Sequence, residues 1–398
     1  MDKNSYDVCI VGGLGHVGLP LGISFAQSGK KVVLYDTNEQ SRDIVASGRL
    51  PFLESGAEEI LKQVLDRTLF VSSDKSVISK SHYVIIAIGT PVDEHLNPKF
   101  TLFKKFFDGI IDLLDDGQHV VLRSTIFPGS TQKIKQYLES KGKKTGLSFC
   151  PERIAQGKAM EELRSLPQIV SAFDDASLNE ARDLFSVLTE DIVFLTPIEA
   201  ELGKLFTNAW RYILFSISNQ FLQIANREGV DFYRIYNGIT YNYPRAASFP
   251  PAGFAAGPCL FKDTMQLAAY SDNNFFLGHS AMLINEGLPN YIVQRLKEKY
   301  KVHEKTVGIL GMAFKANNDD VRESLSFKLK KILEVEAGAV LCSDVYAQNE
   351  GFVSAERLVR ESDIIILGTP HREYAGLVFD KEKVVVDIWN FYGKGSVF

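Results

Sequence analysis

The chain has little of what holds small or extracellular proteins together. Only 4 of its 398 residues are cysteine, and these form neither a CxxC pair nor a metal-ligand spacing with the 7 histidines. The pattern argues against a disulfide framework and against a cysteine-rich metal site. We therefore expect no bound metal and a reducing, cytoplasmic compartment.

Long hydrophobic runs and a strong charge of either sign are missing as well. The longest apolar runs, such as 364–367, are far shorter than the roughly 18 residues that a membrane span needs. The 44 basic and 49 acidic side chains leave a net charge of −5, which argues against binding to nucleic acids or membrane surfaces. The length predicts two or three domains, and we expect neither nucleic acid nor membrane as a partner.

What the chain does have is a regular alternation of short Val/Ile/Leu runs with helical patterns. This alternation is typical of βαβ units in a parallel sheet that is covered on both faces. The strands predicted in the first half are 7–12, 31–36, 69–72, 83–88, 119–125, 147–150, 169–173 and 192–195. After a break, further strands are predicted at 306–310, 339–343, 363–368 and 383–387.

One long helix, 196–230, is predicted where the alternation breaks. Thr196 and Glu199 match a capping box, Pro197 takes the first helical position, and Gly229 suits the C-terminal cap. Apolar residues recur at helical spacing and predict a buried stripe: Leu202, Leu205, Phe206, Ala209, Ile213, Ile217, Phe221 and Ala225. The helix is longer than one small domain needs, so we expect it to join two domains and to lie at a homodimer interface. The predicted fold class is α/β, with two Rossmann-like, doubly wound parallel-sheet domains joined by this helix.

A glycine-rich loop follows the first predicted strand directly. Gly13 would permit a tight turn, Gly15 would let backbone approach a pyrophosphate, and Gly18 would let the following helix pack closely. Asp36, at the end of the second predicted strand, would accept from a ribose 2′-hydroxyl, which favours NAD over NADP. The candidate cofactor residues here are Gly13, Leu14, Gly15, His16, Val17, Gly18 and Asp36. The alternative is a glycine turn between packed elements, with Asp36 a solvated strand end and His16 a packing residue.

Further motifs extend this pattern along almost the whole chain. They are Leu19-Pro20, Gly89-Thr90-Pro91, Ser124 to Gly129, Pro151-Glu152-Arg153 with Gly157, Glu199 to Lys204 with Asn208, Cys259 with Lys262-Asp263, Ala313-Phe314-Lys315 and Asp320 to Ser324. In this order they resemble the nucleotide-sugar 6-dehydrogenase family, which includes UDP-glucose, UDP-N-acetylhexosamine and GDP-mannose dehydrogenases. The resemblance implies an NAD-binding domain over 1–195, a helical, dimerising connector with the catalytic cysteine over 196–300, and a nucleotide-sugar-binding domain over 301–398.

The resemblance also implies the chemistry. Family members oxidise a sugar C6 alcohol to a uronic acid, a polysaccharide precursor, in two hydride transfers to NAD. A cysteine thiolate is needed because an aldehyde has no carbinol to oxidise until a nucleophile adds to it. Cys259 matches this nucleophile, and its Gly/Pro-rich loop beside Lys262 suits an accessible thiol. From its spacing alone Cys259 could equally be structural.

Other residues take their expected roles from the same resemblance. Lys204 and Asn208 share one helix face and would stabilise an alkoxide or oxyanion, although Lys204 could instead pair with Glu201 on a solvated face. Glu152 and Asp263 would activate water and transfer protons while Thr125 holds a water, unless either acid merely caps a helix. The substrate contacts implied are Glu152, Arg153, Lys204, Asn208, Arg245, Gly257 and Lys315. Thr90, Pro91, Thr125 and Arg322 would face the cofactor, although Lys315 and Arg322 could be surface charges.

The chain also departs from the family. Phe254-Ala255-Ala256-Gly257-Pro258 replaces a more glycine-rich segment before Cys259, and Gln156 stands where UDP-glucose dehydrogenases tend to carry a second carboxylate. The substrate base and sugar therefore stay open, with a UDP-hexose or UDP-N-acetylhexosamine favoured. Two other classes compete with this reading: a two-electron hydroxyacid or sugar-phosphate dehydrogenase, and a non-catalytic NAD-binding protein. Neither class needs Cys259 together with Lys204, Asn208 and Glu152.

Overall fold

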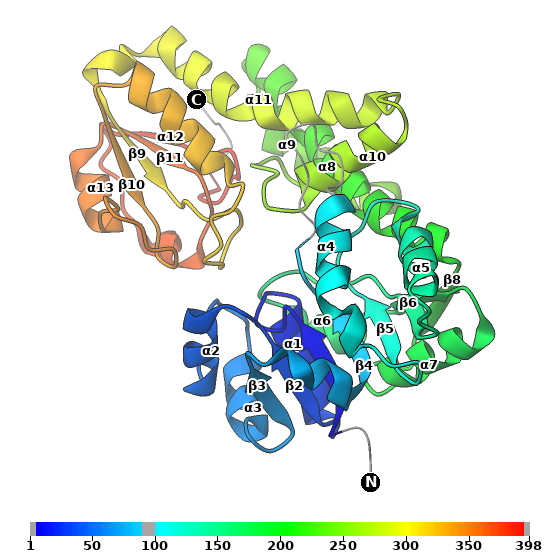
Figure 1. Ribbon diagram of the computed structural model, residues 1–398. Helices are drawn as coiled ribbons and strands as arrows, with labels where there is room; N and C mark the ends of the chain where they lie inside the picture. Colours follow the sequence, from blue (N-terminus) through cyan, green and yellow to red (C-terminus); the bar gives the residue numbers. More distant parts are fainter. Residues whose placement is uncertain (1–4, 90–99, 394–398) are drawn as a thin grey trace. The chain divides into compact units, whose positions relative to one another are not determined.

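An eight-stranded sheet organises the first of two units in a computed structural model that describes residues 5–89 and 100–393. The first unit is residues 1–206 and the second, built on a four-stranded sheet, is residues 207–398. The strands of the first unit are β1 (Tyr6–Val11), β2 (Val32–Tyr35), β3 (Leu69–Ser72), β4 (Ser81–Ile86), β5 (His119–Leu122), β6 (Gly146–Phe149), β7 (Gln168–Ala172) and β8 (Ile192–Leu195). Figure 1 draws these strands as arrows in the blue-to-green part of the chain, and each overlaps a predicted strand.

The strand order in this sheet is β3-β2-β1-β4-β5-β6-β7-β8. Neighbours pair in parallel except for β6 and β7, which are antiparallel, so the sheet is mixed rather than wholly parallel. The helices of this unit are α1 (Gly18–Gln27), α2 (Glu39–Ala46), α3 (Ala57–Val64), α4 (Phe100–Ile110), α5 (Ser130–Ser140), α6 (Ala159–Ser165) and α7 (Asp175–Phe185). Short 3-10 turns, η1 (Lys75–Lys80) and η2 (Ile111–Leu113), complete it.

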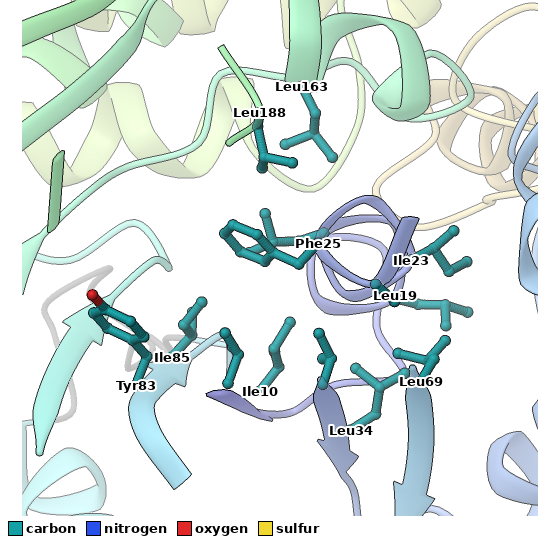
Figure 2. Packing of buried hydrophobic residues seen from close by; sticks show 14 of the residues in the cluster. Ile10, Leu19, Ile23, Phe25, Leu34, Leu69, Tyr83, Ile85, Leu163 and Leu188 are labelled. Carbon is teal, nitrogen blue, oxygen red and sulfur yellow. The ribbon is translucent and has the colours of Figure 1, made fainter. Parts of the chain in front are cut away.

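Both faces of the large sheet are buried, as its apolar strands predict. Val8 and Ile10 belong to one hydrophobic cluster while Cys9 and Val11, pointing the other way, belong to another. Figure 2 shows the first cluster, where Phe25 and other α1 side chains cover the strands. The edge strand β8 is the exception, because Val193 and Phe194 are 39% and 49% exposed.

The second unit contains a smaller parallel sheet of order β10-β9-β11-β12. Its strands are β9 (Thr306–Leu310), β10 (Ala339–Ser343), β11 (Ile364–Leu367) and β12 (Val384–Val386), all on predicted strands. Its helices are α9 (Phe232–Thr240), α10 (Leu260–Tyr270), α11 (Phe276–Lys299), α12 (Leu325–Glu336) and α13 (Ala355–Glu361), with 3-10 turns η3 (Pro244–Ala246), η4 (Val302–Glu304) and η5 (Arg372–Gly376).

The predicted long helix is α8 (Pro197–Arg227), which contains the boundary between the units. The Glu199 carboxylate accepts from the backbone N–H and the hydroxyl of Thr196, and Gly229 has φ +68°, so both predicted caps form. The predicted buried stripe is only partly correct. Leu205, Ala209 and Ala225 are buried, whereas the following residues are exposed: Phe206, Ile217 and Phe221.

The three-way division of the chain stays a prediction, because the structure itself separates two units near the start of α8. Among the described residues, no helix has both the length and the apolar character that a membrane crossing requires.

Candidate functional site

In the glycine-rich turn after β1, the backbone packs closely against β2 and against the start of α1. The left-handed residue is Gly12, with φ +76°, and not Gly13, so the expected cause of the tight turn moves by one position. Gly13 packs instead against β2, because a Cβ there would lie 2.8 Å from the Leu34 Cβ. A Cβ on Gly18 would lie 2.5 Å from the Gly12 carbonyl oxygen, which explains why α1 can start so close to the turn.

Gly15 differs from these glycines because its neighbouring space is open. The nearest atom to a Cβ there would be the Gly12 carbonyl oxygen at 3.7 Å. The Asp36 carboxylate, half-buried at the end of β2, accepts from the backbone N–H of Leu14 at 3.1 Å and from that of Asn38 at 3.0 Å. An open glycine, a helix N-terminus and an accessible carboxylate beside them fit the pyrophosphate and ribose of a dinucleotide.

The remaining predicted cofactor residues are placed less directly. The His16 imidazole stacks on Phe52, with ring centroids 4.0 Å apart, which agrees with its alternative interpretation as a packing residue. Val17 is the residue before α1. Thr90 and Pro91 lie outside the described residues.

Lys204 and Glu152 form a shielded ion pair in the first unit. The Lys204 Nζ lies 3.2 Å from Glu152 Oε1, and the two side chains are only 6% and 12% exposed. The second carboxylate oxygen of Glu152 accepts from the backbone N–H of Ile154 at 2.8 Å. A lysine and a carboxylate held this way offer a cation for a developing negative charge and a base beside it.

The alternative partner of Lys204, Glu201, is occupied elsewhere. Its carboxylate is 1% exposed and accepts from the backbone N–H groups of Gly129 and Thr131, at 2.5 and 2.8 Å, and from the Thr131 hydroxyl. Burial raises the pKa of Glu201, while these hydrogen bonds favour its ionised form. Glu201 therefore caps the start of α5, and the alternative interpretation, a solvated Lys204–Glu201 pair, is wrong.

Two more predicted residues, Thr125 and Arg153, also lie in the first unit. Thr125 is half-buried just beyond the end of β5. Arg153, next to Glu152, donates to the carbonyl oxygen of Pro167, which binds it to the neighbouring loop.

In the second unit, Cys259 is the one exposed thiol among the four cysteines. It is the residue before α10, and its carbonyl oxygen accepts from the Asp263 N–H at 2.8 Å. The N-terminus of a helix stabilises nearby negative charge, which favours the thiolate form of a cysteine there.

The other three thiols are in a different environment. Burial raises the pKa of Cys9 and Cys150 to about 12 and that of Cys342 to about 11. Each lies in or at the end of a strand of the core. They behave as small hydrophobic side chains, whereas Cys259 is exposed and lies at the N-terminus of a helix.

Asp263 and Asn208 form a second shielded pair. The Asn208 Nδ2 donates to Asp263 Oδ2 at 2.5 Å, and these residues are 5% and 0% exposed. Lys262 Nζ lies 3.8 Å from the other carboxylate oxygen. Because Asp263 is fully buried, its visible effect is to orient the Asn208 amide.

Gly257 lies, two residues before Cys259, in a turn whose backbone conformation requires glycine. Its φ is +106°, a Cβ there would lie 2.6 Å from the Phe314 ring, and its N–H donates to the Glu323 carbonyl oxygen. A cavity of about 360 Å³ borders this turn, and its lining includes Ala256, Gly257, Phe261, Val321, Leu325 and Lys328.

The last three predicted residues, Arg322, Lys315 and Arg245, differ in their contacts and exposure. The guanidinium of Arg322 binds the Asp320 carboxylate at 2.6–3.0 Å, and this hydrogen bonding raises the pKa of Arg322. Lys315 is half-buried, with its Nζ 5.9 Å from the centroid of the Phe314 ring. Arg245 is exposed on η3, where its guanidinium lies over the Tyr243 ring and donates to the Tyr243 hydroxyl.

Several buried polar residues around these sites were missed by sequence reasoning. Arg123 bonds to the segment before Glu152, and Glu54 accepts from the N–H groups of Gly157 and Ala159. In the second unit, Asp344 and His371 form a buried pair. The partners are separated by 27 to 105 residues, and no local motif signals such contacts.

Comparison with known families covers most of the chain. The model for the NAD-binding domain of the UDP-glucose/GDP-mannose dehydrogenase family matches residues 6–189. The central domain of the same family matches residues 198–286, and its UDP-binding domain matches residues 308–394.

Individual relatives span nearly the full length. A UDP-N-acetyl-D-mannosamine dehydrogenase of Pyrococcus horikoshii is 28% identical over 94% of this chain and 93% of its own. A solved structure of a UDP-D-ManNAc dehydrogenase from the same organism has a TM-score of 0.89 at 27% identity, covering 97% of this chain and 96% of that one. A UDP-glucose dehydrogenase of Pyrobaculum islandicum gives a TM-score of 0.88 at 26% identity, with 97% and 94% covered.

Proposed function

Since this chain belongs to the UDP-glucose/GDP-mannose dehydrogenase family and is thus an NAD-dependent nucleotide-sugar dehydrogenase, we propose that Cys259 carries its reaction covalently and that its substrate is a UDP-linked N-acetylhexosamine. The observation that carries the first part is the exposed thiol at the start of α10, in a chain whose other thiols are buried. The reaction oxidises the sugar to a uronic acid.

The substrate proposal rests on the relatives. The Pyrococcus horikoshii relative is named for UDP-N-acetyl-D-mannosamine, and a Ralstonia nicotianae relative, 24% identical over 94% of both chains, is an NDP-N-acetyl-D-galactosaminuronic acid dehydrogenase. Both names contain an N-acetylated amino sugar. We accordingly rank UDP-N-acetylhexosamines above UDP-glucose, although a UDP-glucose dehydrogenase is also structurally similar.

The glycine-rich turn of the first unit fits NAD. Gly15 leaves open space at the start of α1, and Asp36 presents a carboxylate that a 2′-hydroxyl could reach but that would repel a 2′-phosphate. When bound, NAD supplies the hydride acceptor for each of the two oxidations.

The thiol solves the problem of the second oxidation. The Cys259 thiolate forms a C–S bond to the aldehyde carbon, and the carbonyl oxygen takes up a proton, which gives a thiohemiacetal. Loss of that proton and a hydride restores the C=O bond as a thioester. Water then attacks this carbon, the C–S bond breaks, and the products are the carboxylate, the regenerated thiolate and two protons that pass to solvent.

The other candidate side chains are assigned to stabilising charge and moving protons. Lys204 supplies a cation, and Asn208, with one amide N–H given to Asp263, has a second N–H for an oxyanion. Because Asp263 is fully buried, we assign water activation to Glu152, with Thr125 holding the water, and we assign Asp263 to orienting Asn208.

Counting NADH tests this proposal. In single-turnover experiments with UDP-N-acetylhexosamines, the wild type should release two NADH per sugar, and Cys259→Ser should release at most about one rapidly. Cys9→Ser and Cys342→Ser lose stability but should keep the ratio of two. Two NADH per sugar from Cys259→Ala at near wild-type rate would refute the covalent route. One NADH from the wild type would favour the two-electron alternative.

We also propose that the protein is a homodimer built on α8 and α9. Trp210, Phe221 and Ile224 on α8 are 56%, 45% and 44% exposed, and Ile235 and Ile239 on α9 are each 45% exposed. Their spacing is helical, so each helix presents an apolar stripe that one chain leaves uncovered. A second copy of the chain would cover it symmetrically.

Light scattering tests the dimer. The wild type should have twice the 44.4 kDa mass of the chain, and Phe221→Asp should shift it toward the monomer. Val335→Asp is the matched control, because Val335 is 84% exposed on α12 and should leave the dimer intact. A wild-type monomer at micromolar concentration would disprove the interface.

A further inference from the structure

Arg123 is a charged side chain with almost no access to solvent. It is 1% exposed and follows β5 directly. Its Nη1 donates to the carbonyl oxygens of Cys150 at 2.8 Å and Pro151 at 3.3 Å, and to the Gln168 side chain at 2.8 Å. The guanidinium also lies over the Phe185 ring, 5.1 Å from its centroid.

Such burial is costly, because the partners of Arg123 are neutral. Among the described residues the structure shows no ion pair to this guanidinium, and its Nε has no hydrogen-bond partner. Burial lowers the pKa of Arg123 to about 10, which still leaves it charged at neutral pH. The nearby Glu152 carboxylate favours the charged form but offsets only part of the effect of burial, so an apolar side chain would stabilise the fold more at this position unless the charge has a use.

We look for that use at Glu152, which directly follows the Cys150 and Pro151 carbonyl groups that Arg123 binds. We propose that Arg123 is a positioning residue for Glu152, holding the Cys150–Pro151 backbone so that the Glu152 carboxylate stays against Lys204. This inference rests on the proposed function, because it assumes that Glu152 takes part in the reaction.

The contacts around the segment support a rigid mounting. Arg123 binds the two carbonyl groups immediately before Glu152, while the buried Glu54 carboxylate accepts from Gly157 and Ala159 at 2.9 and 2.7 Å beyond it. Between these anchors, Glu152 is itself fixed by Lys204 and Ile154. Loss of the first anchor frees the backbone that leads into Glu152, and a displacement near 1 Å can slow a reaction about 100-fold.

A matched control exists at the opposite end of the same strand. Gln118, just before β5, is 5% exposed, and its Nε2 donates to the carbonyl oxygens of Ile78 and Ser81. It is therefore a buried clamp on two carbonyl groups, like Arg123, but it holds no segment with a proposed catalytic residue. Gln118→Met measures what the loss of such a clamp does to the fold alone.

The experiment compares Arg123→Met, Arg123→Lys, Gln118→Met and Glu152→Gln in the full-length enzyme, with UDP-N-acetylmannosamine as the probe substrate. We expect kcat to fall about 10- to 100-fold in Arg123→Met, with the KM for NAD unchanged, and to recover partly in Arg123→Lys. Gln118→Met should lose stability but keep kcat.

Each result decides something. If Arg123→Met folds and keeps kcat, or if Gln118→Met loses as much kcat, the positioning role is wrong. If Arg123→Met does not fold, Arg123→Lys decides: a kcat lowered several-fold at unchanged KM for NAD supports the role, and a wild-type kcat overturns it. Full activity in Glu152→Gln would instead refute the proposed function of Glu152.

Discussion

The two units each place an aspartate at the end of the strand beside a glycine turn, yet only one turn is left open. In the first unit, Asp36 accepts from the Leu14 N–H and stays partly accessible. In the second, Asp344 accepts from the Met312 and Ala313 N–H groups, but its side chain is 0% exposed. The same local arrangement thus presents a carboxylate to a ligand in one unit and buries it in the other.

His371 accounts for much of that difference. Its Nε2 lies 3.1 Å from Asp344 Oδ2, and its Nδ1 accepts from the Asn317 N–H at 3.0 Å. With Nδ1 as the acceptor from Asn317, Nε2 is the ring nitrogen that faces the Asp344 carboxylate. The second turn is therefore filled by the chain's own side chains, which hold the segment carrying Lys315, and a glycine turn with an aspartate does not by itself make a dinucleotide site.

The largest expected effect comes from replacing the glycine of each turn, Gly15 in the first unit and Gly311 in the second, with alanine. Gly311 has φ +90°, and a Cβ there would lie 2.4 Å from the Thr369 carbonyl oxygen, so Gly311→Ala should lower the free energy of unfolding by about 3 kcal/mol. Gly15→Ala meets no such contact and should keep its stability, but NAD affinity should fall about 10- to 100-fold. Denaturant unfolding and NAD titration of both variants measure this. The reverse pattern would contradict the comparison.

Next in size is the effect of the accessible carboxylate. Asp36→Asn removes the charge that favours a ribose 2′-hydroxyl and repels a 2′-phosphate, so kcat/KM for NAD should fall roughly 10-fold or more. The ratio of NADP to NAD activity should rise in the same variant. Asp344→Asn serves as the control and should leave both cofactor values unchanged. Equal kcat/KM for the two cofactors in the wild type would remove the basis of this prediction.

The smallest effect concerns acid stability. Burial alone would raise the pKa of Asp344, but the hydrogen bond from His371 and the nearby backbone N–H groups lower it to about 2. The folded carboxyl therefore holds its proton less tightly than the unfolded one, and ionised Asp344 stabilises the fold by about 2 kcal/mol above pH 4. This contribution should disappear as the pH falls from 4 to 2.

Unfolding of the wild type and Asp344→Asn, compared between pH 2 and pH 7, checks the sign. The difference in unfolding free energy between them should be greatest above pH 4 and should shrink in acid. A difference that grows toward pH 2 would mean that Asp344 is not ionised in the folded protein.

The sequence predicted local features well where neighbours along the chain decide them. The twelve strands found in residues 5–89 and 100–393, and both caps of α8, lie where the residue pattern indicates, because these depend on side chains within a few positions. The residue pattern said less about the direction in which a strand runs and about which face of a helix is buried. It did not show that β7 runs antiparallel to β6, nor that Phe221 on the predicted buried stripe is 45% exposed in a single chain.

For the candidate site, too, the sequence indicated the residues but not the contacts between them. The residue types Cys259, Lys204, Glu152, Asn208 and Asp263 were identified by motif, but their pairing was not. Glu152 pairs with Lys204, which is 52 residues further along the chain. Glu201 does not pair with Lys204 on its own helix but caps α5, by accepting from the N–H of Thr131, 70 residues away. Contacts at that separation depend on how strands and helices pack, and residue spacing alone carries no signal for them.

The sequence by itself determined the strands, the long capped helix, the glycine-rich turn with its aspartate, and the family to which their order belongs. Tertiary structure alone decided which glycine turns the chain, which aspartate stays accessible and which cysteine is exposed. The physical reason is that hydrogen bonding and periodicity within an element are local, whereas burial depends on what packs against it. Asp36 and Asp344 occupy similar local positions, and only the packing of His371 against the latter separates a carboxylate that can bind a ligand from one that holds the fold together.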